Sequence, residues 1–186
     1  MLKITLEFLQ EKKACSDGIK YFKTLEKQEW ELVELIKKCC DDMQIIYADW
    51  LLTSLDNVDD LKDVVKFYKS KGFRLDCVFE CCKDLIKEAG LEYFKSLVDY
   101  QSKGFRLDCV FECCQDLIKE AGLEYFKELV KHQQSKGWSL SYVFKHYQDL
   151  IKEVGLEYFK ELVKHQQSKD WGLGYVNKHF PCLQIR

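Results

Sequence analysis

Cysteine is the residue of this chain best suited to chemistry, because six of its ten cysteines recur as two sets with the same spacing. The sets are Cys77, Cys81 and Cys82, and Cys109, Cys113 and Cys114. Thiols four residues apart on a helix can place two ligands on one metal ion, as zinc sites require. A third copy of the segment carries Tyr142 and His146 at the paired positions. We therefore interpret these cysteines as packing residues and expect no metal or other cofactor.

Histidine is the other candidate for chemistry, and it occurs only in the last part of the chain. The four residues are His132, His146, His165 and His179, which form two pairs 33 residues apart. No nucleophile elbow, phosphate-binding loop or H-E-x-x-H helix accompanies them. The sequence therefore predicts a protein that is not an enzyme.

These residues lie in a repeated segment. Residues 72–95 read GFRLDCVFECCKDLIKEAGLEYFK, and residues 104–127 differ from them only by Gln115 in place of Lys83. A diverged third copy starts at Gly137 and a truncated fourth at Asp170, so the steps are 32, 33 and 33 residues. Such a period is typical of repeat proteins built from one helical unit.

Each repeat is predicted to form two helices. Apolar residues at three- and four-residue spacing indicate a first helix over residues 75–89, called helix A, and a second over 91–103, called helix B. Gly90 is expected to separate them in a backbone conformation with positive φ. Asn57 occupies the same place in an earlier repeat and is the next-best residue for that conformation. The repeats are therefore predicted to begin at residue 57.

The predicted fold class is all-α, with tandem helix-turn-helix repeats of 32–33 residues stacked as a solenoid. A single proline and nine glycines among 186 residues, with 47% apolar content, favour packed helices over a strand-rich fold. Residues 1–56 are predicted to form a divergent N-terminal helical cap module. Residues 57–186 are predicted to form the hairpin repeats, ending in a truncated unit.

Charge and hydropathy narrow the classes of partner. The net charge is −2, and no apolar run approaches the roughly 18 residues of a membrane span. The N-terminal residues do not form a signal peptide, so we expect a cytoplasmic protein with reduced thiols and no membrane partner. Arg74 and Arg106 are replaced by Ser139 and Gly172 in the later repeats. This broken basic stripe makes a nucleic-acid partner the less favoured expectation.

Two segments resemble known families. NVDDLKDVVKFYKSKGF from Asn57 and AGLEYFKELVKHQQSKGW from Ala121 resemble the second helix and turn of ankyrin repeats. The Thr-Pro-Leu-His start of an ankyrin first helix is absent, so the chain resembles an ankyrin-like helical hairpin repeat protein. This resemblance implies protein binding without catalysis.

The N-terminal residues resemble a small helical module of bacteriophage and prophage proteins. The likeness lies in ACSDGIKYF, LVELIKKCC and YADWLLTSL. It implies a phage-encoded inhibitor of a host defence complex, such as a CRISPR nuclease, acting in the host cytoplasm. A structural or self-assembling repeat protein and an RNA-binding helical repeat remain as alternatives.

The protein-binding surface is expected where equivalent residues differ between repeats and lie off the apolar stripes. These positions are Ser96, Glu128 and Glu161 on helix B and Lys83, Gln115 and Gln148 on helix A. Trp138 and Trp171 follow the turns between repeats and form a second candidate edge.

The C-terminal repeat lacks its second helix, and this predicts self-association. The residues that start its first helix are Leu173, Tyr175, Val176 and Phe180. The last unit of a solenoid leaves one side uncovered unless it is polar. We therefore expect a second copy of the protein, in a homodimer, or the target itself to cover these residues.

Overall fold

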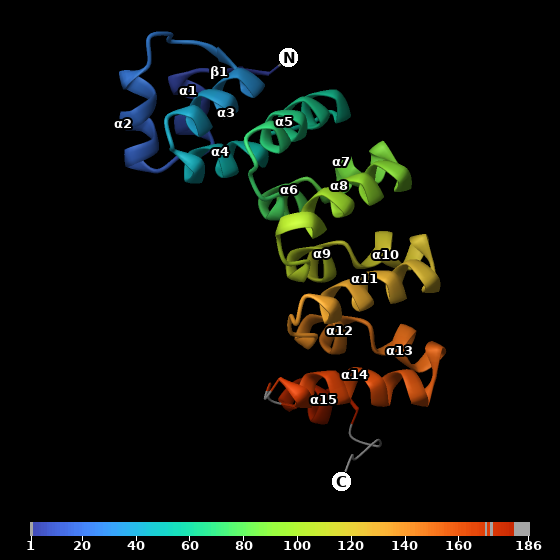
Figure 1. The fold of residues 1–186 in the computed structure, drawn as a ribbon. Helices are drawn as coiled ribbons and strands as arrows, with labels where there is room; N and C mark the ends of the chain where they lie inside the picture. Colours follow the sequence, from blue (N-terminus) through green and yellow to red (C-terminus); the bar gives the residue numbers. More distant parts are fainter. Residues whose placement is uncertain (1, 170, 172, 181–186) are drawn as a thin grey trace. The chain divides into compact units, whose positions relative to one another are not determined.

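The computed structural model of the chain describes residues 2–169, 171 and 173–180, and these residues form fifteen helices and two short strands (Figure 1). The prediction of an all-α class is confirmed. The chain divides into two compact units, Met1–Glu88 and Ala89–Arg186. The predicted module boundary at residues 56 and 57 falls inside the first unit.

The first unit combines a two-stranded ribbon with seven helices among its described residues. Its elements are β1 (Lys3–Ile4), α1 (Leu6–Glu11), α2 (Ser16–Thr24), β2 (Trp30–Glu31), α3 (Leu32–Asp41), α4 (Ile45–Leu52), α5 (Val58–Ser70), α6 (Asp76–Cys81) and α7 (Lys83–Ala89). The strands are antiparallel, with buried Ile4 opposite buried Trp30. Helix α3 packs against α4 and α5, and α4 packs against α6. This arrangement places α3 at the centre of the unit.

Asn57 has a different role from the one expected. Its φ is −145°, so it lies in the extended region, and its side-chain oxygen accepts a hydrogen bond from the Asp60 amide at 2.8 Å. It is therefore the N-cap of α5, and the expectation of a positive φ at this residue was wrong. At Asn57 a polar side chain caps the start of the helix, whereas at the equivalent glycines the chain turns into the helix through a positive φ.

The second unit contains three long helices, each separated from the next by two short ones. Its elements are α8 (Leu91–Gly104), α9 (Asp108–Cys113), α10 (Gln115–Ala121), α11 (Leu123–Ser135), α12 (Ser141–His146), α13 (Gln148–Val154), α14 (Leu156–Ser168) and α15 (Gly174–His179). Helix α12 packs against both α9 and α15, while α10 packs against α11 and α13 against α14. The apolar stripes predicted for helix B are buried, as Phe126, Leu129 and Val130 of α11 illustrate. Each long helix is thus a helix B, and each pair of short helices replaces a helix A.

The single helix A predicted for each repeat is wrong, because a break divides it after six residues. The breaks lie at Cys82, Cys114 and Tyr147, whose φ values are −115°, −112° and −123°. The side chain at each break is buried. Tyr147 Oη donates a hydrogen bond to the Phe111 carbonyl at 2.9 Å, and Cys82 Sγ lies 3.7 Å from the Leu52 carbonyl. The Phe111 carbonyl belongs to the last turn of α9, where intrahelical donors are missing. The Leu52 carbonyl, at the end of α4, also accepts a hydrogen bond from the Leu55 amide at 3.1 Å.

The turn glycines have the predicted positive φ, but they lie outside the left-handed helical region. Gly90, Gly122 and Gly155 have φ values of 95°, 94° and 113°, with ψ between 165° and 174°. This region is accessible essentially only to glycine, whereas the left-handed helical region also admits asparagine. Gly104, in contrast, is the last residue of α8. A side chain is therefore disfavoured at the three glycines that link helix A to helix B.

No helix in the described part of the chain has both the length and the apolar content needed to cross a bilayer.

Candidate functional site

The three predicted helix B positions are all exposed. Ser96, Glu128 and Glu161 lie on α8, α11 and α14, and only Ser96 uses its side chain locally, donating to the Tyr93 carbonyl at 2.7 Å. One turn further along, Asp99, Lys131 and Lys164 are exposed as well. We call these six residues the helix B face. None of them is needed for the core, so the face is open to a partner.

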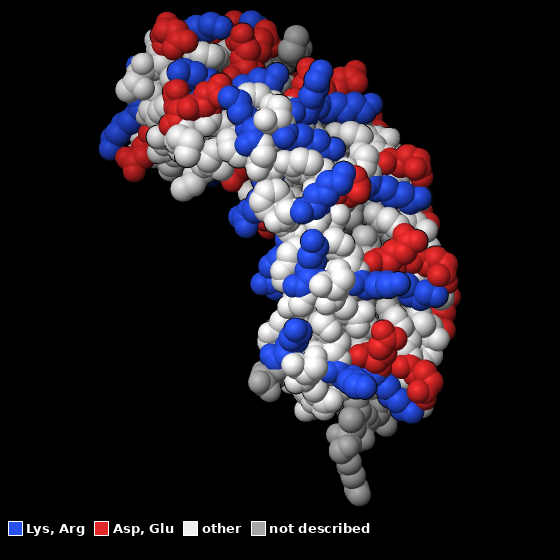
Figure 2. Space-filling model, in the orientation of Figure 1, with Lys and Arg blue, Asp and Glu red and all other residues white. Residues whose placement is uncertain are grey.

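Ion pairs border the helix B face and repeat with it. Lys127 Nζ lies 2.6 Å from a Glu124 carboxylate oxygen, and the equivalent Lys160–Glu157 distance is 2.8 Å. Figure 2 shows basic and acidic side chains alternating along the second unit. Exposed pairs of this kind contribute little to stability. Their effect is to present a surface of mixed charge.

The predicted helix A positions are less available. Lys83 is exposed, whereas Gln115 and Gln148 are half-buried. Gln115 Nε2 donates to the Glu112 carbonyl at 3.0 Å, and Gln148 Nε2 donates to the Lys145 carbonyl at 3.3 Å. Both glutamines therefore satisfy carbonyls at the helix breaks. The structure does not place these side chains together with the helix B face.

The two predicted tryptophans are half-buried against histidines of helix B. Trp138 packs edge-on to His132 with ring centroids 6.0 Å apart, and Trp171 packs in the same way on His165 at 5.7 Å. His132 Nε2 also lies 3.0 Å from the Ser102 carbonyl oxygen. These contacts hold the rings on the turn edge and leave part of each ring exposed.

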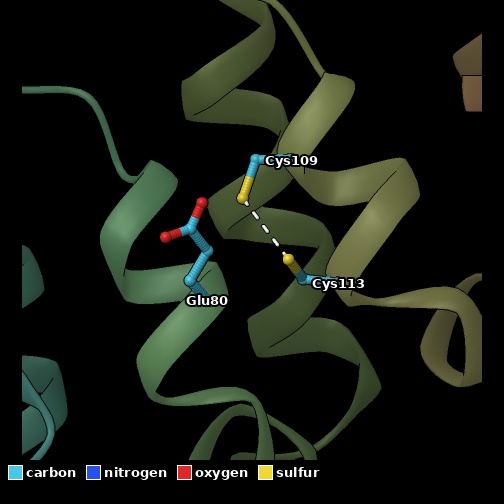
Figure 3. A group of neighbouring side chains, drawn as sticks. All are labelled: Glu80, Cys109 and Cys113. Carbon is cyan, nitrogen blue, oxygen red and sulfur yellow. Dashed lines mark hydrogen bonds between the residues drawn. The ribbon is translucent and has the colours of Figure 1, made fainter.

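The cysteines fall into two groups. Cys39, Cys40, Cys82 and Cys114 are buried, and burial raises the pKa of Cys39 and of Cys82 to about 12. They fit the packing interpretation. Cys15 and Cys81 are exposed, and Cys77, Cys109 and Cys113 are half-buried. The sulfur atoms of Cys109 and Cys113 lie 3.7 Å apart (Figure 3). Glu80, also drawn there, belongs to the first unit. Two thiols supply only half of the four ligands of a structural zinc site.

A row of buried glutamines was missing from the predicted residues. Gln101, Gln133 and Gln166 on the three helices B are at most 1% exposed. Gln133 Oε1 accepts from the Leu107 amide at 3.4 Å, and its Nε2 donates to Asp108 Oδ1 at 3.1 Å. Gln166 accepts from the Leu140 amide at 3.0 Å in the same way. Leu107 and Leu140 are the N-caps of α9 and α12 and give no side-chain cap of their own. Gln133 and Gln166 therefore tie helix B to the start of helix A.

The predicted self-association residues are largely inside the second unit. Val176 and Phe180 are 4% and 3% exposed, and the Phe180 ring lies 4.8 Å from that of Phe159. Leu173 is half-buried, and the Tyr175 side chain and Pro181 lie outside the described residues. Val176 and Phe180 therefore do not form the exposed surface that was expected. Leu156 of α14 is 51% exposed and was not among the predicted residues. Self-association through Leu173 and Tyr175, or their coverage by the target, stays a prediction.

Comparison of the chain with protein families, curated proteins and solved structures finds no match.

Proposed function

We propose that this chain is a non-enzymatic protein-binding repeat protein whose helical hairpins stack as a solenoid and whose partner docks on the helix B face. The ankyrin-like resemblance of the sequence supports this class. Helix α12 packs against α9 of the preceding repeat and α15 of the following one, which supports the stacking. A stacked array presents equivalent positions at regular intervals, which suits the recognition of an extended protein surface.

One observation carries the choice of surface. Helices α11 and α14 have the same sequence, LEYFKELVKHQQS, so they expose the same Glu and Lys side chains twice, 33 residues apart. The core does not require these residues, because α8 has Ser96 and Asp99 in their places. An exposed, duplicated set of side chains outside the packing is the feature that a partner can read.

The phage-like N-terminal module extends this proposal to the identity of the partner. It supports a host defence complex, such as a CRISPR nuclease, as the target. The same binding mode then acts by blocking a surface that the target needs.

Site-specific crosslinking tests the proposed surface. A photoreactive phenylalanine at Glu128 or Glu161 should crosslink to one and the same protein in a bacterial lysate. Glu120 and Glu153 form the matched control, since both are exposed glutamates on α10 and α13 at equivalent places in the same repeats. Crosslinking of the same protein from all four sites, or from the control pair alone, would contradict the proposal.

A gel-shift series separates this function from RNA binding. The acidic residues of the helix B face predict no retained RNA at any salt concentration. An RNA complex that weakens steeply as salt rises would instead identify phosphate contacts and favour the RNA-binding alternative.

A further inference from the structure

We propose that a cavity in the first unit binds a free amphiphilic anion, such as a fatty carboxylate, with its apolar chain inside and its charged head at Lys13. The cavity has a volume of about 310 Å³ and lies between α1, α2, α3 and α4. That volume is in the range of small-molecule binding sites. This site is separate from the helix B face and does not depend on the function proposed above.

The walls of the cavity are apolar and aromatic. Leu9, Phe22, Leu35 and Leu51 are buried, and Trp50 completes the lining on α4. Such walls release water at little cost and favour an apolar ligand body.

The polar atoms in the walls are neutral or already engaged. Tyr21 Oη donates to Asp42 Oδ2 at 2.8 Å, so this residue contributes its ring, which lies 5.5 Å from that of Tyr47. Burial raises the pKa of the lining residue Cys39 to about 12, which keeps its thiol uncharged. The interior thus offers no charge for a ligand head group.

Lys13 supplies the charge. Among the described residues that line the cavity, it alone carries a formal charge, and it is exposed. A single cation beside an apolar cavity is complementary to a molecule with an apolar body and one anionic group. A neutral apolar molecule would leave this lysine unused.

The backbone at Lys13 has a feature that supplies a control for the test. Its φ is 57°, and the amides of Lys13 and Ala14 bond to the carbonyls of Gln10 and Leu9 in the arrangement that usually ends a helix at glycine. Met43 after α3 has the same feature, with φ of 61°, and is 76% exposed in the turn leading to α4. These two are the non-glycine residues with positive φ in the described chain.

The test uses the full chain with decanoate and 1-decanol, and follows the change in tryptophan fluorescence on binding, since Trp50 lies in the cavity wall. Because an exposed ion pair contributes modestly, wild type should bind decanoate about two- to fivefold more tightly than decanol. Lys13→Gly should remove this preference while raising the melting temperature. Met43→Gly is the matched control, since it relieves the same backbone strain and should leave the preference unchanged.

Filling the cavity with Ala14→Phe should abolish binding of both probes. Equal affinities of wild type for decanoate and decanol would overturn the proposal, as would no binding of either. Binding to anionic phospholipid vesicles without binding of decanoate would also overturn it, because it would assign Lys13 to a membrane surface.

Discussion

The hydroxyl of Tyr147 donates a hydrogen bond to the carbonyl oxygen of Phe111 over 2.9 Å, and this bond joins two successive repeats. Tyr147 lies at the break between α12 and α13, and Phe111 lies in α9 just before the equivalent break. The carbonyl near the end of α9 thus finds its donor in the next repeat. The break at Tyr147 is in this way tied to the preceding repeat.

Tyr147→Phe should lower the free energy of unfolding by about 1–3 kcal/mol, because the buried Phe111 carbonyl would lose its donor. Urea denaturation of the two proteins measures the difference. Tyr142→Phe is the control, since Tyr142 is half-buried in α12 of the same repeat and should change stability by less than about 0.5 kcal/mol. Equal stability of Tyr147→Phe and wild type would show that the bond does not hold the break.

Gln133→Met should destabilise the chain by about 1–3 kcal/mol, because the amide of Leu107 would be left without its acceptor inside the protein. Gln134→Met is the neighbouring control and changes a half-buried side chain outside the glutamine row. Hydrogen exchange at the Leu107 amide is the direct measurement. Unchanged protection at Leu107 in Gln133→Met would contradict the capping role.

Gly122→Asn should be as harmful as Gly122→Ala, each costing about 1–3 kcal/mol, because a φ of 94° with a ψ of 171° excludes both side chains. Gly104→Ala should instead stabilise by about 0.4–1 kcal/mol, since this glycine ends a helix and no atom would obstruct a methyl group. Melting temperatures of the three variants provide the comparison. A mild Gly122→Asn would place this residue in the left-handed helical region after all.

Stability should fall with rising pH above about 9 through the buried thiols. Burial raises the pKa of Cys82 from 9.0 to about 12, so between these values the unfolded chain releases a proton that the folded chain retains. The contribution of the Cys82 thiol to the free energy of unfolding is therefore fully present below pH 9 and is lost as the pH rises towards 12. Denaturation from pH 8 to 10 should show a shallower decline for Cys82→Ala than for Cys81→Ala, whose parent side chain is exposed. The same decline in both variants would refute the assignment.

Local periodicity was sufficient to predict each helix B and its buried stripe, but not the break within helix A. Phe126, Leu129 and Val130 recur at helical spacing, and all three are buried. The break after Cys113 could not be predicted, because neither proline nor glycine marks it. The Phe111 carbonyl before this break accepts its hydrogen bond from the hydroxyl of Tyr147. Because Tyr147 belongs to the next repeat, the residues around the break carry no signal of this bond.

The exposure of the candidate site residues could be predicted from the sequence where they lie off the apolar stripes of the helices. Glu128 and Glu161 lie off the apolar stripes and are exposed. Gln133 was missed because polar residues are ordinarily assigned to the surface. A signal was present, since glutamine recurs at Gln101 and Gln166 while a neighbouring position changes from Asp99 to Lys131.

The most direct test of the account is the affinity of the crosslinked partner for the double variant Glu128→Lys with Glu161→Lys. Reversing two charges on the helix B face should weaken binding by about tenfold or more, because it places like charges against a complementary surface. The control, Glu120→Lys with Glu153→Lys, changes the net charge equally on α10 and α13 and should bind as wild type does. Wild-type affinity in the first variant, with its fold intact by circular dichroism, would contradict the helix B face as the binding surface and direct attention to Trp138 and Trp171.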